Sequence, residues 1–422
     1  MILARALRAD RRSDLELAFD RMALPSAARE YLLEKVPLMQ VLLTGLGRDE
    51  GRFLKEKMEG QEQPGREEFP QYVAGDVRHR PGAGLLTGRR DQVERLRGEA
   101  KRAGLAELAR ALGEVLEAPE VPAPLEVGGK VLRFDGGPLL MGVLNVTPDS
   151  FSDGGAFLDP ERAIAHGQAL VAEGAALLDV GGESTRPGAA PVTAQEERGR
   201  VLPVIRALVK DGVLVSVDTR KPEVARAALE AGASLVNDVA GFQDEAMARV
   251  VADSKAACCL MHMQGTPETM QRHPHYGDVV EEVLDFLRAA VARATQAGVP
   301  REKILIDPGI GFGKTLEHNL VLLRRLEDLR LLGLPLLVGT SRKAFLGHLT
   351  GGKPASERLH ATLGSVAAMT VLGGADVVRV HDVAEARDAL LVANAVRHAR
   401  GGGDLYEKPP PGAPKGPLHV HG

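Results

Sequence analysis

Between residues 139 and 399, short apolar runs alternate with amphipathic helical segments, and this alternation constrains the fold more than any other feature of the chain. Apolar, often β-branched runs that each lead into a polar cluster are typical of parallel strands. The expected strands are residues 139–146, 176–181, 213–217, 234–239, 256–262, 303–307, 334–339 and 376–381. The expected helices are residues 159–174, 194–211, 221–232, 244–253, 278–298, 317–332, 356–373 and 383–399. Eight strand–helix units over roughly 260 residues predict a (β/α)8 TIM barrel, assigned to residues 127–399.

An open, doubly wound parallel sheet is the alternative fold for the same alternation. That fold needs a glycine-rich phosphate loop after its first strand, and the segment GVLNVTPDS at 142–150 is not one. A two-stranded hairpin is expected just before the barrel, because the segments LEVGG and KVLRF meet at Gly128 and Gly129. The sequence therefore favours an α/β chain with a TIM barrel that is preceded by a β-hairpin.

Residues 1–118 are interpreted as a separate N-terminal α-rich domain of unknown role. Helical periodicity is found in 13–24, 26–40 and 89–116. The segment 59–84 between them is punctuated by Pro and Gly, and we interpret it as a surface loop, with a small ligand site as the alternative.

Two further segments lack helical and strand periodicity. Residues 119–126 are a predicted linker, because prolines occupy positions 119, 122 and 124. Residues 400–422 are rich in Pro and Gly and poor in apolar residues, so this tail is predicted to be disordered.

Composition and charge exclude several classes of protein. The chain carries 53 Lys and Arg residues against 57 Asp and Glu residues, and this balance argues against a nucleic-acid-binding protein. We find no apolar run long enough to span a membrane, and the N-terminus lacks the apolar core of a signal peptide. Cys258 and Cys259 are adjacent on an expected strand and point to opposite faces, so no disulfide is expected. We therefore expect a cytoplasmic protein.

Acidic and amide side chains lie at the ends of three expected strands. Asp218 ends the run VLVSVD, Asp307 ends ILID, and Asn237 follows SLV. A single such Asp is as readily explained as a cap of the next helix. Together, two carboxylates and an amide in a barrel mouth suit a flat heterocycle, because a guanidine-like N–C–N edge pairs with a carboxylate through two parallel hydrogen bonds.

Basic residues follow the last two expected strands. Ser341 and Lys343 lie in the segment SRK, and Arg379 and His381 are two residues apart, so they share one strand face. Alone, SRK would be an ordinary helix start with solvent-facing charge. In TIM barrels, however, the loops after strands 7 and 8 often hold a phosphate, so we favour an oxyanion site.

The loops after the first two strands are candidates for lids over the mouth. Residues 147–157 and 183–193 are rich in Gly, Pro, Ser and Asp, a composition that is also common in plain connectors. Asn145, at the end of the first strand, is a candidate Mg²⁺ ligand through its amide oxygen, although it could simply turn the chain before Pro148. Phe312 is expected to form one side of a second, apolar sub-pocket.

Several of these segments resemble the dihydropteroate synthase family of the folate pathway. The similarity runs in order from about residue 125 to 399 and is carried by MGVLNVTPDSFSDGG, DVGGESTRPG, SVDT, NDV, MHMQGTP, DPGIGFGK, GTSRK and RVHDV. The resemblance implies condensation of 6-hydroxymethyl-7,8-dihydropterin diphosphate with 4-aminobenzoate, giving 7,8-dihydropteroate and pyrophosphate, with Mg²⁺ as cofactor. Residues 1–118 have no counterpart in the minimal enzyme of this family.

The resemblance also implies roles for single residues. Asn145 is then the Mg²⁺ ligand, while Asp218, Asn237 and Asp307 bind the pterin. The pterin diphosphate is held by Thr185, Lys343, Arg379 and His381. Phe151, Asp153 and Arg186 are loop residues that become ordered when both substrates bind, and Phe312 and Ser341 belong to the aminobenzoate pocket. Asp153, Arg186 and Lys343 are the expected catalytic residues. We also expect a homodimer.

Two other classes of protein share parts of this pattern. A non-catalytic pterin-binding module of corrinoid methyl transfer has no diphosphate to hold, so the SRK and RVH segments argue against it. A scaffold with a vestigial barrel would not need the complete set of rim residues. Because an aryl amine is already a neutral nucleophile, the expected displacement at the exocyclic CH₂ group needs no strong base, in line with the lack of a Ser-His-Asp set.

Overall fold

The computed structural model describes residues 39–59, 69–77, 80–147, 160–184 and 191–399. The chain divides into two compact units between Ala118 and Pro119. The expected helices at 13–24 and over most of 26–40 lie outside the described residues, as does the tail 400–422.

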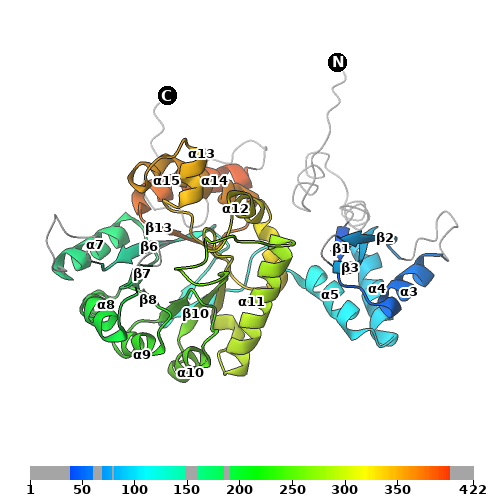
Figure 1. Cartoon of the computed structure of the whole chain (residues 1–422), viewed down its shortest axis with the longest axis horizontal. Coiled ribbons are helices and arrows are strands. Elements are labelled where there is room, and N and C mark those ends of the chain that lie inside the picture. The colour runs from blue at the N-terminus through cyan, green and yellow to red at the C-terminus, as the bar shows by residue number, and fades with distance from the viewer. Residues whose placement is uncertain (1–38, 60–68, 78–79, 148–159, 185–190, 400–422) are drawn as a thin grey trace, which may run out of the picture. The chain divides into compact units, whose positions relative to one another are not determined.

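Eight parallel strands form a closed barrel in the second unit (Figure 1). Their order is β11-β10-β9-β8-β7-β6-β13-β12. A parallel bridge between Ile306 of β11 and Leu336, the residue before β12, joins the first and last strands of this order. The backbone N–H of Ile306 also donates to the carbonyl of Pro335 at 3.0 Å. The strands are β6 (Leu139–Asn145), β7 (Leu177–Gly181), β8 (Val215–Asp218), β9 (Leu235–Asp238), β10 (Ala257–Met261), β11 (Ile304–Asp307), β12 (Leu337–Val338) and β13 (Val377–Val380). The predicted TIM barrel is therefore confirmed, and the open sheet is excluded.

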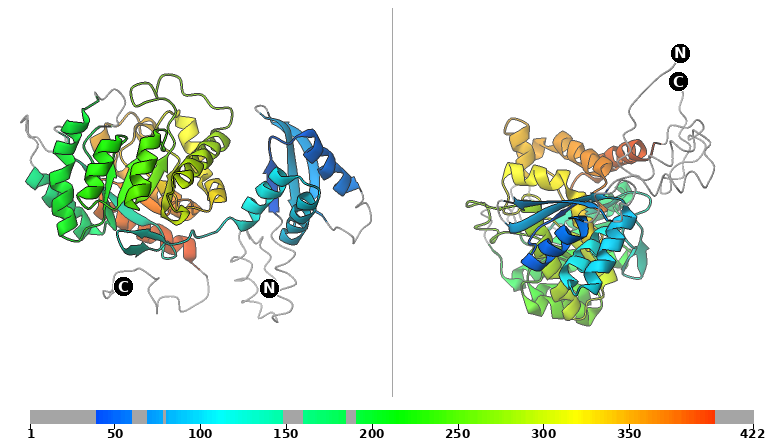
Figure 2. Two further views of the ribbon diagram at one scale, coloured as in Figure 1. Left: turned by 90° about the horizontal axis from the view of Figure 1, so that it is seen from below. Right: turned by 90° about the vertical axis from the view of Figure 1, so that its right-hand side faces the viewer.

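Helices cover the outer face of this barrel (Figures 1 and 2). They are α7 (Pro160–Glu173), α8 (Ala194–Lys210), α9 (Pro222–Glu230), α10 (Glu245–Ser254), α11 (Val279–Gln296), α12 (Leu316–Arg324), α13 (Ala344–Leu349), α14 (Leu359–Leu372) and α15 (Val383–His398). The main apolar core lies between these helices and the strands. Among the described helices, none combines the length and apolarity that crossing a membrane would require.

The predicted hairpin closes the lower, N-terminal end of the barrel. Strand β4 (Leu125–Val127) pairs with β5 (Lys130–Leu132), and Gly128 and Gly129 form the turn with φ of +56° and +75°. The buried hairpin side chains cluster with residues at or near the strand starts: Leu125, Val127, Leu132, Phe134, Leu177, Leu235, Leu337 and Val377. The expected linker 119–126 overlaps β4 by two residues. The C-terminal rim is thus the end that remains available for a ligand.

The first unit contains a sheet that the sequence analysis did not predict. Strands β1 (Met39–Leu43), β3 (Arg80–Gly88) and β2 (Gln71–Val77) pair antiparallel in that order, so interpreting 59–84 as a surface loop was wrong for residues 71–77 and 80–84. Its glycines were taken as turn signals, but Gly84 faces the Tyr72 ring, where a Cβ atom would lie 2.1 Å from a ring carbon. The helices of this unit are α3 (Arg48–Glu59), α4 (Arg90–Arg102) and α5 (Ala106–Glu117). The expected helix 89–116 is therefore two helices, because Gly104 ends the first with φ of +77°.

Candidate active site

The inward polar residues of the barrel lie one layer closer to its C-terminal rim than the apolar layer at the strand starts. Successive inward side chains on a strand are two residues apart, so Leu177 is followed by Asp179, Leu235 by Asn237, and Val377 by Arg379. The lower members of these pairs belong to the cluster that the hairpin covers. The upper members converge at the C-terminal side, where TIM-barrel enzymes bind their ligands.

Arg379 joins two carboxylates in this layer. Its Nε donates to Asp179 Oδ2 at 2.6 Å, and its Nη2 donates to Asp218 Oδ2 at 2.8 Å. Asp179 is fully buried and also accepts hydrogen bonds from Ser216 Oγ at 2.6 Å and from Asn237 Nδ2 at 2.9 Å. The network therefore links strands β7, β8, β9 and β13 through one carboxylate.

Asp179 was missed by the sequence analysis. The acids that were selected, Asp218 and Asp307, end their strands, whereas Asp179 lies inside β7 two residues before Gly181. The signal that would have found it is a charged residue in the apolar run ALLDVGG, because a carboxylate buried on a barrel strand must find ionic or hydrogen-bond partners.

The amide of Asn237 presents an acceptor to the site. Its nitrogen donates to Asp179, while its oxygen Oδ1 is buried and has no hydrogen-bond partner among the described residues. A buried polar atom left in this way in a native fold calls for an explanation, and a ligand donor is one.

Burial and neighbouring charge shift the ionisation of the rim residues. Burial, with the nearby Asp179 carboxylate, raises the pKa of Asp218 to about 7, although Arg379 acts in the opposite direction. Burial also raises the pKa of Asp307, which the Lys343 ammonium partly offsets. Burial lowers the pKa of Lys343 to about 8 against the favourable field of Asp307.

The loop after β11 brings Asp307, Phe312 and Lys343 together. Asp307 Oδ1 accepts from the backbone N–H of Gly309 at 2.7 Å, and the Lys343 ammonium donates to the carbonyl of Ile310 and lies 4.7 Å from the centre of the Phe312 ring. Gly309 is required here, because its φ is +67° and a Cβ atom would lie 1.9 Å from the carbonyl oxygen of His262.

Phe312 packs beside an apolar cluster at the same end of the barrel. This cluster contains Val239, Met261, Met263 and Met270. Methionine side chains adapt to flat rings, so the cluster is suited to the face of a heterocycle.

His262 forms part of the wall. Its Nδ1 lies 2.8 Å from Lys314 Nζ, and burial together with that ammonium lowers the pKa of His262 to about 2, so the ring is neutral. Burial also lowers the pKa of Lys314 well below its ordinary value.

Asn145, Ser341 and His381 form a second cluster at the rim. His381 Nδ1 lies 2.9 Å from Ser341 Oγ, and its Nε2 lies 3.4 Å from Asn145 Nδ2. The backbone N–H of His381 donates to the same Ser341 oxygen at 3.2 Å. The turn that carries Ser341 and Lys343 contains Arg342 with φ of +58°, an uncommon conformation for this residue type that a salt bridge to Asp382 holds.

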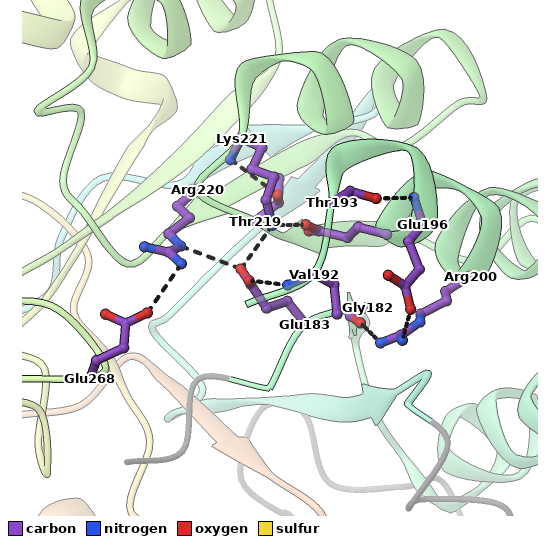
Figure 3. Close-up of polar contacts among 11 residues, drawn as sticks. Gly182, Glu183, Val192, Thr193, Glu196, Arg200, Thr219, Arg220, Lys221 and Glu268 are labelled. Carbon is purple, nitrogen blue, oxygen red and sulfur yellow. Dashed lines mark hydrogen bonds and ion pairs between the residues drawn. The ribbon is translucent and has the colours of Figure 1, made fainter. Parts of the chain in front are cut away.

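The base of the loop after β7 is held by one carboxylate (Figure 3). Glu183 Oε1 accepts from the backbone N–H of Val192 at 3.1 Å, which brings the two ends of the loop together. Its Oε2 accepts from Lys221 Nζ at 3.0 Å and from Arg220 Nε at 3.3 Å. The expected loop residues Phe151, Asp153, Thr185 and Arg186 lie outside the described residues.

Metal-binding groups are sparse in the part of the chain that the structure describes. No cluster of three or more His, Cys, Asp or Glu side chains there is arranged to hold an ion.

Fold and rim together define a barrel enzyme that binds a flat heterocycle rich in hydrogen-bond donors. Residues 141–381 match the family described as pterin binding enzymes. The dihydropteroate synthase of Escherichia coli K12 is 47% identical over 264 residues, which cover 62% of this chain and 93% of that relative. The chain belongs to the dihydropteroate synthases within the pterin binding enzymes.

Solved structures of this family have the same barrel. A dihydropteroate synthase from Xanthomonas albilineans with 4-aminobenzoic acid superposes with a TM-score of 0.62 at 46% identity, covering 66% of this chain and 99% of that one. Another structure from that organism, in complex with 7,8-dihydropteroate, gives a TM-score of 0.60 at 44% identity, with 66% and 100% covered.

Proposed function

We propose that Asp218, Asn237 and Asp307 bind the pterin ring in the reaction that this chain catalyses as a dihydropteroate synthase. That reaction transfers the pterinylmethyl group of 6-hydroxymethyl-7,8-dihydropterin diphosphate to 4-aminobenzoate in folate biosynthesis, and releases pyrophosphate. The buried Asn237 oxygen that lacks a partner among the described residues is the observation that carries the proposal. It lies beside carboxylates that already accept from the planar guanidinium of Arg379, and the pterin edge has the same N–C–N donor pattern.

The diphosphate is assigned to the cations at the same rim. Lys343 and Arg379 are positive groups near Asp218 and Asp307, and His381 follows directly after β13. A Lys ammonium and an Arg guanidinium stabilise the charge that grows on a departing diphosphate. Thr185 is assigned to the same substrate on the strength of the segment GGESTRPG alone.

Departure of the diphosphate is the step that the rim favours. The dihydropterin ring releases electrons towards its exocyclic CH₂ carbon, and the Asp218 and Asp307 carboxylates stabilise the positive charge that develops there. The amine nitrogen of 4-aminobenzoate then forms the new C–N bond and loses a proton. Asp153 and Arg186 are proposed to act from their loops when both substrates are bound.

The second substrate is assigned to the rim beside Phe312 and Ser341. Phe312 offers an apolar ring face, and Ser341 Oγ offers a polar group near His381. The two residues lie on the loops after β11 and β12, so an aryl amine bound between them would lie at the edge of the pterin site.

Mg²⁺ is the proposed cofactor, and Asn145 is its proposed ligand. Asn145 would supply one amide oxygen to a Mg²⁺ ion that takes its other ligands from substrate oxygens and water. Asn145 directs its amide nitrogen at His381, which leaves its carbonyl oxygen for that role. When bound, the ion would neutralise charge on the diphosphate.

We also infer a homodimer and a cytoplasmic location. On helix α14 Val371 and Leu372 are exposed, and on the adjoining α15 Val392 and Val396 are 67% and 62% exposed, an apolar surface suited to a second copy. Cys258 and Cys259 are buried free thiols, in keeping with a reducing compartment.

Pyrophosphate release by the purified chain tests the proposed function. With both substrates and Mg²⁺ we expect turnover. Omission of 4-aminobenzoate should abolish formation of 7,8-dihydropteroate, because the new C–N bond needs the amine. A chain that binds pterin but releases no pyrophosphate would be a binding module instead.

A further inference from the structure

The buried carboxylate of Asp179 contacts two of the residues assigned to the substrates. It accepts from Arg379 at 2.6 Å and from Asn237 at 2.9 Å, and its third partner, Ser216, is a neutral hydroxyl on β8. Because Asp179 is fully buried beneath these side chains, it acts on the ligand through them.

Arg379 has two anionic partners, and only one of them is also needed by the pterin. Its Nη2 donates to Asp218, the carboxylate assigned to the pterin edge, whereas its Nε donates to Asp179. A pterin edge that pairs with both oxygens of Asp218 competes with the guanidinium at Oδ2. Arg379 can give up its contact with Asp218 and still keep an ionic partner only if Asp179 continues to bind the guanidinium.

We propose that Asp179 is a positioning residue that anchors Arg379 while the pterin replaces the guanidinium at Asp218. The same carboxylate fixes the Asn237 amide with its oxygen turned away from Asp179, and so presents that oxygen to the ring. This inference rests on the proposed assignment of Asp218 and Asn237 to the pterin.

Calorimetry with 6-hydroxymethyl-7,8-dihydropterin, which lacks the diphosphate, tests the proposal in the full chain. In Asp179→Asn the guanidinium keeps only Asp218 as an ionic partner, so it competes with the pterin, and we expect binding to weaken roughly tenfold. Asp179→Ser, which leaves room for water in place of the carboxylate, carries the same expectation and serves if Asp179→Asn does not fold.

A double variant separates this role from a merely structural one. In Asp179→Asn combined with Arg379→Ala the competitor is gone, so we expect pterin affinity to recover to within about threefold of the unmodified chain. A loss that persists in the double variant, or unchanged affinity in Asp179→Asn, would overturn the proposal.

Two further variants serve as controls. Asp376→Asn removes the carboxylate of another buried pair, Arg330–Asp376, which lies before β13 at the opposite end of the barrel. It should lower the unfolding temperature and leave pterin affinity unchanged. If Asp376→Asn weakened pterin binding as much as Asp179→Asn, the effect of Asp179 would be explained by lost stability alone, and the proposal would be contradicted. Asp218→Asn tests the assignment of the ligand: unchanged pterin affinity there would refute the assignment itself, whatever Asp179 does.

Discussion

At the scale of single residues, the site holds a partly buried acid and a partly buried base whose pKa values are shifted towards each other. Burial raises the pKa of Asp218 to about 7 and lowers that of Lys343 to about 8. In the proposed roles Asp218 acts as a carboxylate, above its pKa, and Lys343 acts as an ammonium, below its pKa. Both side chains are therefore charged together only in a narrow range of pH.

This narrow pH range predicts a bell-shaped dependence of kcat/KM on pH. The kcat/KM for the pterin diphosphate should fall below about pH 7 as Asp218 is protonated, and above about pH 8 as Lys343 loses its proton. Lys343→Arg should move the alkaline limb upward, because a guanidinium stays protonated throughout this range. Steady-state rates at constant ionic strength give the profile. An alkaline limb that stays in place in this variant would contradict the role of Lys343.

The pterin ring and the diphosphate of the substrate should depend on different residues for binding. Asp218→Asn should weaken binding of the pterin without its diphosphate by about 1–3 kcal/mol, because ring donors then face a poorer acceptor. Lys343→Ala should leave that binding nearly unchanged and weaken the diphosphate substrate instead. Calorimetry with both ligands measures each effect, and equal losses in the two variants would argue against separate sub-sites.

At the scale of elements, Glu183 holds the base of the loop that carries Thr185 and Arg186. Its carboxylate joins the two loop ends to the segment after β8 through Lys221 and Arg220 (Figure 3). The side chain of Glu183 is only 7% exposed, and these cations lower its pKa against the effect of burial. The loop is thus attached to the barrel by partly buried charge pairs.

Glu183→Gln should impair this attachment. The amide still accepts from Val192 but loses both ionic contacts, so we expect kcat/KM for the pterin diphosphate to fall about tenfold. The matched control is Glu245→Gln on α10, which breaks an exposed pair with Arg249 and should change little. Equal rates for the two variants would show that Glu183 does not position the loop.

The elements that could be predicted from the sequence are those with a regular pattern. The barrel strands were recognised because apolar runs led into polar clusters, and the hairpin because Gly128 and Gly129 suit a tight turn. Strands β2 and β3 were missed because glycines there serve close packing, as at Gly84 against Tyr72. Asp179 was missed because its role depends on contacts from three other strands, which no local pattern records.

At the scale of the whole molecule, each unit has its own apolar core. The core of the first unit contains Leu54, Leu86, Leu96 and Leu112, and among the described residues it includes none beyond 118. The barrel cores draw their residues from 125 onward. Separate cores are the physical basis for independent folding.

We therefore predict that residues 119–422 alone fold and catalyse the condensation. A chain that starts at residue 136 is the control, because it lacks Leu125, Val127, Leu132 and Phe134. Loss of these buried side chains should cost several kcal/mol, at roughly 1.5–3 kcal/mol each. Thermal unfolding and pyrophosphate release compare the two chains. An inactive or insoluble 119–422 would make the first unit part of the catalytic machinery.

The β4–β5 hairpin also determines where further sequence can be joined to the N-terminal side of the barrel. The polypeptide enters the barrel at the pole opposite the rim, since the hairpin packs beneath the strand starts. Any upstream sequence is therefore covalently joined to the barrel on the side remote from the reacting atoms. A gene fusion at that point adds a new module without inserting a residue into any of the loops that perform the chemistry.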